Sequence, residues 1–99
     1  MTTEHRALVT WSAEQVRQGL PQISETIDPA WFDDAAPKKG DGWSLVCRFD
    51  PSPLQQGNPS AARVRFMVDE APHERLRPGI SLRLFERGTR GLATVEILD

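Results

Sequence analysis

The sequence predicts an all-β protein with a minor helical part, an antiparallel barrel or sandwich of four to six short strands. Several segments alternate apolar and polar residues with a period of two, which is typical of strands that bury one face. Proline or glycine stands at each junction between them, as in folds made of many short strands. A chain of 99 residues suffices for one domain and not for two, so we expect a single domain over residues 1–99.

The strands are placed by this alternation. They are expected over residues 6–11, 43–50, 62–68, 80–86 and 93–98, the last two joined by a turn at Arg87-Gly88. In the first strand, Leu8 and either Val9 or Trp11 would point inward. In the others, the side chains expected to face the interior are Trp43, Leu45, Cys47, Phe49, Val64, Phe66, Val68, Ile80, Leu82, Leu84, Ala93, Val95 and Ile97. Phe85 would face outward, and strand 62–68 is paired with strand 80–86.

A short helical turn is expected over residues 13–18, after the first strand. Ser12 and Gln15 match a capping box, in which the Ser12 side chain caps the Gln15 amide and the Gln15 side chain reaches back to the Ser12 amide. A glycine at position 19 and a proline at position 21 end the turn. Its inward residues would be Val16 and Leu20.

Residues 21–42 carry no clear period. Ile23 and Ile27 would lie on a strand or in an irregular segment, and Trp31 and Phe32 form an apolar pair among acidic residues. Tryptophan in so small a chain belongs either to the core or to a contact surface, and it is enriched at binding hot spots. Trp31 and Phe32 are therefore a candidate contact patch.

The overall charge argues against nonspecific binding to nucleic acid. The net charge is −2 and the pI is near 5.6, whereas such binding needs an excess of lysine and arginine. The single cysteine, Cys47, cannot form an internal disulfide. No apolar run approaches the roughly 18 residues of a membrane-spanning helix, and the N-terminus lacks the pattern of a signal peptide. We therefore expect a cytoplasmic protein without membrane contact.

The C-terminal third runs from a leucine and a glycine into an alternating strand, a Glu-Gly-type turn and a strand of small and β-branched residues. These positions are Leu76, Gly79, Ile80, Leu82, Leu84, Glu86, Gly88, Ala93 and Val95. In this order the segment resembles the C-terminal β-barrel domain of elongation factor Tu. The resemblance implies a six-stranded antiparallel β-barrel, here with one short N-terminal helical turn, in which Val64, Phe66 and Val68 belong to the preceding strand.

The resemblance does not extend to a GTPase. The chain has no Gly-Lys-Thr phosphate loop, no guanine-reading motif and no counterpart of the Gly-Tyr-Arg-Pro segment that the family carries upstream. The family barrel helps to hold transfer RNA and contacts an exchange factor. None of the residues that form those surfaces matches a position of this sequence.

No residue set is expected to be catalytic or to hold a metal or cofactor. His5 and His73 are the only histidines, and a zinc site needs about four ligands at a recognisable spacing. Cys47 stands at a core-facing position and is expected to be a buried small residue, not a nucleophile. Asp33-Asp34 and Asp69-Glu70 are expected to be solvated surface charge, and Gly40-Asp41-Gly42 a turn before a strand.

We expect a non-enzymatic binding module that acts through contacts with a protein partner. The alternative is binding to RNA of the transfer-RNA type, which the resemblance to a translation factor suggests. Its cationic face would be Arg63, Arg65 and Arg83, expected on neighbouring strands. A solvated sheet edge is the other explanation of this arginine row.

Overall fold

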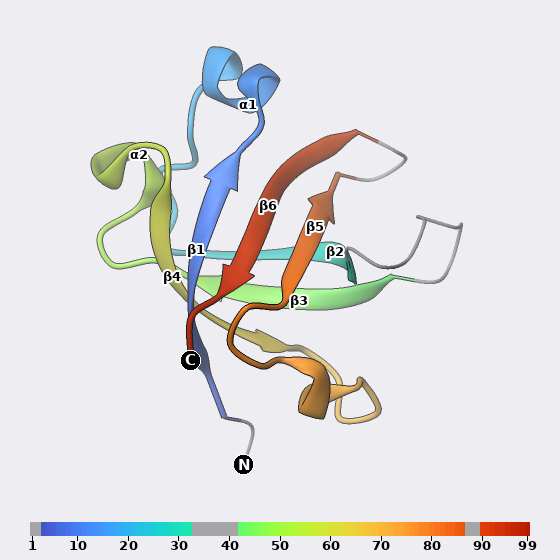
Figure 1. Cartoon of the computed structure of the whole chain (residues 1–99). Coiled ribbons are helices and arrows are strands. Elements are labelled where there is room, and N and C mark those ends of the chain that lie inside the picture. Colours follow the sequence, from blue (N-terminus) through green and yellow to red (C-terminus); the bar gives the residue numbers. More distant parts are fainter. Residues whose placement is uncertain (1–2, 33–41, 87–89) are drawn as a thin grey trace.

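The computed structural model describes residues 3–32, 42–86 and 90–99 (Figure 1). Three features singled out in the sequence lie wholly or partly outside the described residues. They are the Asp33-Asp34 pair, the glycine cluster at 40–42 and the turn at Arg87-Gly88. Within the described ranges, no helix is long and apolar enough to cross a membrane.

Six antiparallel strands form a closed barrel in the order β1-β4-β3-β2-β5-β6. The strands are β1 (His5–Trp11), β2 (Glu25–Phe32), β3 (Trp43–Arg48), β4 (Ser60–Phe66), β5 (Ser81–Phe85) and β6 (Gly91–Ile97). The sheet closes because β1 pairs with β4 on one side and with β6 on the other. The prediction of a six-stranded antiparallel barrel is confirmed.

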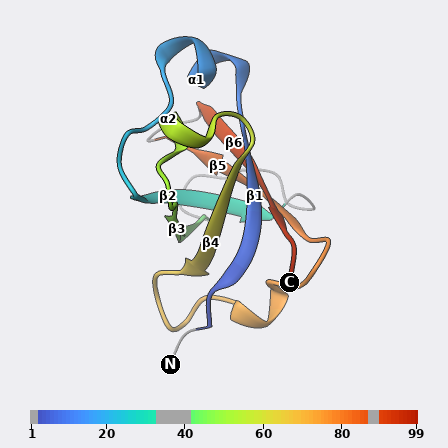
Figure 2. The ribbon, with the colours of Figure 1, turned by 90° about the vertical axis from the view of Figure 1, so that its left-hand side faces the viewer.

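The helices lie at the two ends of the barrel (Figures 1 and 2). Helix α1 (Ala13–Gln18) and the single turn α2 (Pro53–Gln56) lie at one end, and a 3-10 turn (His73–Arg75) lies at the other. Helix α1 has the predicted bounds, but Val16 is 44% exposed where an inward position was expected. A helix of six residues at the end of a barrel reaches the core only where the chain returns, at Leu20.

The predicted capping box is half right. The Ser12 hydroxyl accepts a hydrogen bond from the Gln15 amide at 3.1 Å, as expected. The Gln15 side chain instead donates to the Gly19 carbonyl at 2.8 Å. The Ser12 amide is not available to it, because it donates to the carbonyl of Leu92 in β6 at 2.8 Å. This bond fastens the start of α1 to the barrel.

Alternate side chains of all six strands fill the interior. The predicted inward residues of β3 to β6 lie in the core or pack against it. In β1 the inward residues are Ala7, Val9 and Trp11, so the expectation for Leu8 was wrong. Trp11 determines which residues of β1 point inward, because its indole nitrogen donates to the buried hydroxyl of Ser60 at 3.0 Å.

The predicted pairing of strand 62–68 with strand 80–86 is wrong. Strand β4 lies between β1 and β3, and β5 lies between β2 and β6. The error arises because residues 25–32 have too little alternation to be recognised as a strand from the sequence. Once β2 is inserted beside β5, the two predicted neighbours fall on different sides of the barrel.

Candidate functional site

The barrel wall is only partly closed between β2 and β5. Three residue pairs join these strands: Ala30 with Leu84, Trp31 with Arg83, and Phe32 with Leu82. Strand β2 has eight residues and β5 has five, so β2 extends beyond its neighbour. Residues 25–29 pair with β3 on one side, and no strand in the described part of the chain pairs with their other side. We call this unpaired length of β2 the open seam.

A cavity of about 470 Å³ runs along the open seam. Its β2 wall is formed by four consecutive residues, Glu25, Thr26, Ile27 and Asp28. Successive side chains of a strand point to opposite faces. A cavity in contact with all four must therefore follow the edge of the strand. The remaining walls are Trp11, Gln15, Pro21, Ile23 and Leu92, from the α1 end of the barrel.

The backbone of β2 directs hydrogen-bonding groups into the open seam. The Phe49 amide donates to the Ser24 carbonyl at 2.7 Å, so Ser24 faces β3. In an antiparallel ladder, successive residues bond alternately to one side and the other. The N–H and C=O groups of Glu25 and Ile27 therefore point away from β3. No hydrogen bond that the described residues make outside the strand ladders reaches these groups.

Pro29 follows the same alternation. Its register partner on β3, Ser44, accepts a hydrogen bond from the Met67 amide at 2.9 Å, on the side away from β2. The backbone of Pro29 therefore also faces the open seam. Because proline has no N–H, this position leaves no unpaired donor, and the Ala30–Leu84 pair of the ladder places its carbonyl opposite the Phe85 amide. Proline in a strand is found where the neighbouring edge is free.

The open seam is acidic. Burial raises the pKa of the Asp28 carboxyl, and the negative charge of Glu86 raises it further. Arg90 is the nearby cation, but its guanidinium is shared between Glu86, at 2.7 Å, and Glu14, at 3.0 Å. Asp28 and Glu25 have no ion pair within the described ranges. A charged group that enters the cavity therefore meets the carboxylate of Asp28, which has no ion-pair partner within the described ranges.

The rim of the open seam is apolar. Ile23 is 59% exposed and Ile27 is 51% exposed, the two highest values among the large apolar side chains described. Behind them, Trp11 and Leu92 are buried and form the apolar floor. Exposed apolar side chains around a concave surface are typical of interaction sites.

Cys47 lies directly across from Thr26 on β3 and is fully buried. Burial raises the pKa of its thiol to about 12; the neighbouring Thr26 hydroxyl opposes this rise and the Asp28 charge adds to it. A thiol that stays protonated at neutral pH is not a nucleophile. The expectation that Cys47 is a buried small residue is confirmed.

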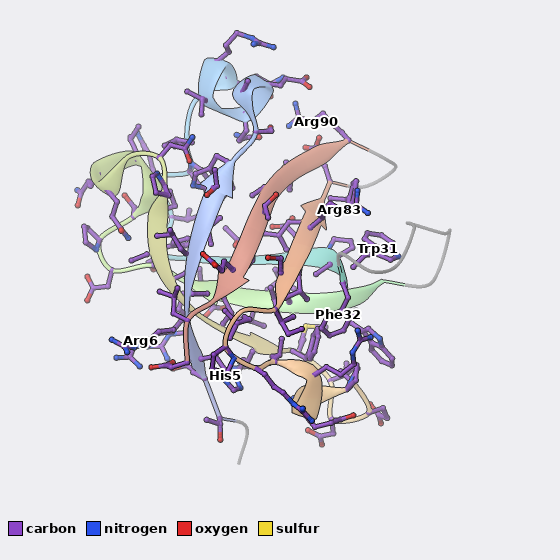
Figure 3. The ribbon with its side chains drawn as sticks, viewed as in Figure 1. His5, Arg6, Trp31, Phe32, Arg83 and Arg90 are labelled. Atoms are coloured by element: carbon purple, nitrogen blue, oxygen red, sulfur yellow. The ribbon has the colours of Figure 1, made fainter. Side chains whose placement is uncertain are left out.

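Trp31 and Phe32, the predicted contact patch, point to opposite faces of β2 (Figure 3). Phe32 is 6% exposed and packs in the core against Phe66, so it cannot belong to an exposed patch. Adjacent residues of a strand alternate, and only one of the two can face outward. Trp31 is on the outer wall, where its ring meets the edge of Phe85 at 5.0 Å.

The predicted cationic face of Arg63, Arg65 and Arg83 does not form. Arg63 and Arg65 alternate with the buried residues of β4 and therefore point outward. Arg83 points outward from β5, next to Phe85 and on the Trp31 side of the barrel (Figure 3). The two strands are not neighbours, so the three guanidinium groups do not share a surface. The face was predicted because strands 62–68 and 80–86 were expected to be neighbours, and that pairing is wrong.

A different arginine row crosses three adjacent strands. Arg63 of β4 is the register partner of Arg6 on β1 and of Arg48 on β3. All three line an open cavity of about 690 Å³, whose walls also include the core residues Ala7, Phe49 and Ala62. Arg6 is paired with Asp99 at 2.6 Å and Arg48 with Glu4 at 2.8 Å. Arg63 has no ion pair within the described ranges, so it is the least neutralised cation of this row.

The two histidines make separate hydrogen bonds. His5 contacts the C-terminal Asp99 through its Nδ1, and His73 contacts the Val68 carbonyl through its Nε2 at 2.9 Å. No group of three or more metal-ligating side chains occurs among the residues that the structure describes. Asp69 and Glu70 are exposed, as expected of solvated charge.

The open seam was not predicted from the sequence. In the sequence its apolar rim is visible only as two isoleucines that would lie on a strand or in an irregular segment. The one sequence signal was Pro29, because proline inside a strand indicates a free edge. Pro29 indicates a free edge only after residues 25–32 have been recognised as a strand.

Comparison of the chain with protein-family models, with curated proteins and with solved structures finds no match. A function is therefore proposed from the geometry of the open seam and of the arginine row.

Proposed function

We propose that this protein is a small non-enzymatic binding module of the cytoplasm that acts through protein–protein contacts at the open seam. The observation that carries the proposal is the cavity along the unpaired length of β2. Its rim exposes Ile23 and Ile27, and the backbone of Glu25 and Ile27 presents groups that have no hydrogen-bond partner among the residues the structure describes. A partner that covers the apolar rim removes it from water, which is favourable. Its backbone would replace the water bound to these groups, which adds a modest net gain for each hydrogen bond.

The resemblance to the C-terminal barrel of elongation factor Tu supports this proposal at the level of the barrel fold. Its support is the β5–β6 hairpin, in which Leu82, Leu84, Ala93 and Val95 pack in the interior as the resemblance implies. The family barrel contacts another protein, the exchange factor. That precedent agrees with a role in protein contacts, although the contact residues of the family have no counterpart here.

The test compares seam variants with a surface control in affinity capture from the lysate of the source organism. Ile23→Asp with Ile27→Asp should lose the partner that the wild-type protein retains, because two charges replace the apolar rim. Met67→Asp is the matched control, since Met67 is 47% exposed and follows β4 at its far end. Retention of the same partner by the double variant, with the barrel still folded by circular dichroism, would contradict the proposal.

RNA binding is the second candidate function, and the arginine row favours it. Three outward arginines on adjacent strands offer guanidinium groups to a phosphate backbone, which arginine binds in bidentate fashion. Four carboxylates oppose this, because Asp99 and Glu4 pair with two of the arginines, and Glu25 and Asp50 line the same cavity. The row is therefore a weaker candidate than the open seam.

A filter-binding titration of transfer RNA at low ionic strength tests this candidate. If the row binds RNA, affinity should fall steeply as salt is added, and Arg63→Glu should abolish it. Arg17→Glu is the control, because Arg17 is an exposed arginine on α1, outside the row. Equal affinity of both variants, or no binding with folded protein in excess, would remove RNA as a partner.

A further inference from the structure

We infer that the open seam takes an extended segment of a partner protein as an added β-strand, and that this segment places a lysine or arginine beside Asp28. This inference rests on the proposed function and deepens it, because it names the conformation and the charge of the partner.

The backbone of β2 determines the conformation. Glu25 and Ile27 each turn an N–H and a C=O toward the open seam. These groups recur at every second residue, which is the spacing that another strand matches with its own N–H and C=O groups. Addition of an extended peptide to a free sheet edge is a common mode of recognition. The cavity along this edge leaves room for the added chain.

The residues on the interior side of the open seam determine which charge the partner segment should carry. Side chains of an added strand that face the barrel interior would lie beside Thr26 and Asp28. Asp28 carries a partly buried carboxylate that is also repelled by Glu86. Arg90 does not relieve this repulsion in full, because Glu14 and Glu86 share its guanidinium. A cation on the partner would relieve it, whereas an anion would strengthen it.

The residues on the outer side of the open seam determine which side chains flank the basic residue in the partner segment. Ile27 points outward and is 51% exposed, and Ile23 stands next to it on the rim of the cavity. A side chain on the outer face of the added strand would cover Ile27 only if it is apolar. The expected partner segment therefore alternates apolar and basic residues.

A second copy of this chain fits the open seam poorly. Pairing β2 with β2 would bring the carboxylates of Glu25 and Asp28 close to those of the copy. Like charges across a strand pair are destabilising. Pro29 also blocks one donor of the edge, which hinders continuous pairing of identical edges. A basic partner segment avoids the charge repulsion, and only the missing donor of Pro29 opposes its binding.

The experiment is a titration of the 15N-labelled protein with three acetylated and amidated peptides of seven residues. They alternate isoleucine with lysine, with serine or with glutamate. A fourth peptide carries backbone N-methyl groups in the lysine sequence, which prevent strand pairing. The readouts are the chemical shifts and the exchange rates of the Glu25 and Ile27 amides.

The lysine peptide should bind about tenfold more tightly than the serine peptide, and the glutamate and N-methylated peptides should not bind measurably. It should also slow the exchange of the Glu25 and Ile27 amides. Asp28→Asn should reduce the affinity for the lysine peptide to that for the serine peptide. Glu96→Gln is the control variant, an exposed acid on the outer wall of β6, and should leave the affinity unchanged.

Equal affinities for the lysine and serine peptides would overturn the inferred charge while the proposed function stands. Binding of the N-methylated peptide, or shifts that map away from β2, would overturn strand addition. So would concentration-dependent shifts of the β2 amides without peptide, since these would identify a second copy as the occupant. Failure of all peptides together with capture of a partner that depends on Ile23 and Ile27 would overturn this inference alone.

Discussion

Leu84 is a side chain whose removal should damage the barrel severely. It is 1% exposed, and its register partners are Ala30 on β2 and Ala93 on β6. The leucine therefore fills the space that two alanines leave on either side. Leu84→Ala would place three alanines in a row across three strands, and a hydrogen-bonded sheet cannot move inward to close the gap.

The expected loss of stability for Leu84→Ala is about 3–5 kcal/mol. Three carbon groups are removed, and each buried group contributes about 0.8 kcal/mol, or about 2.4 kcal/mol in total. The cavity term adds to this, because the whole effect of such a substitution is about 2–5 kcal/mol and is largest where the site cannot collapse. A small domain has roughly 5–15 kcal/mol in all, so the variant should be close to unfolding.

Phe85 is the matched comparison, one residue along the same strand. Its ring is on the outer wall and packs against Trp31, with the centroids 5.0 Å apart. Such a pair contributes about 0.5–1.5 kcal/mol beyond the buried area, so Phe85→Ala should cost about 1–2 kcal/mol. This exceeds the cost expected of a residue that simply faces solvent.

Urea unfolding followed by circular dichroism measures both variants. Leu84→Met keeps the volume and should cost less than about 1.5 kcal/mol, so it gives a folded reference if Leu84→Ala does not fold. A Phe85→Ala loss equal to or larger than that of Leu84→Ala would refute the register of β5, and every inward and outward assignment on that strand would invert.

Three further predictions concern buried polar groups. Ser60→Ala removes the acceptor of the Trp11 indole N–H, and urea unfolding should show a loss of about 1–3 kcal/mol; no loss would contradict a buried hydrogen bond at this position. The Cys47 thiol should react with an aromatic disulfide reagent at pH 8 no faster than the protein unfolds, because burial raises its pKa to about 12; immediate reaction would show an exposed thiolate. Asp28 has a folded-state pKa raised above its ordinary value of 3.8, so the wild-type protein should lose stability as pH rises from 3.8 through that pKa. Asp28→Asn should therefore have the higher Tm at pH 7 and an advantage that shrinks below pH 3.8, and a lower Tm at pH 7 would contradict this.

The fold class could be predicted because β4 and the β5–β6 hairpin alternate buried and more exposed side chains, and because Leu45 and Cys47 follow the same period on β3, where Val46 on the other face is buried as well. Their alternation fixes which residues point inward, and Leu45, Val64 and Leu82 are all fully buried as expected. Strand order could not be predicted in the same way. It depends on β2, whose sequence contains Asp28 and Pro29 and hides the period of two.

The candidate site could not be predicted from the sequence for the same reason, because β2 was not recognised as a strand. Phe32 was grouped with Trp31 because the two are adjacent in sequence, and only a recognised strand separates them onto two faces. The arginine row likewise needs the order of β1, β4 and β3 before Arg6 and Arg48 can be placed beside Arg63. The open seam depends on a difference in strand length, which the sequence does not show.

Residue-resolved amide hydrogen exchange of the free protein tests the open seam most directly. The amides of Thr26 and Asp28 face β3 and should be protected, whereas those of Glu25 and Ile27 face the open seam and should exchange much faster. This alternation along β2 is the result that the account predicts. Equal protection of all four amides would show that the edge is already covered, and would contradict it.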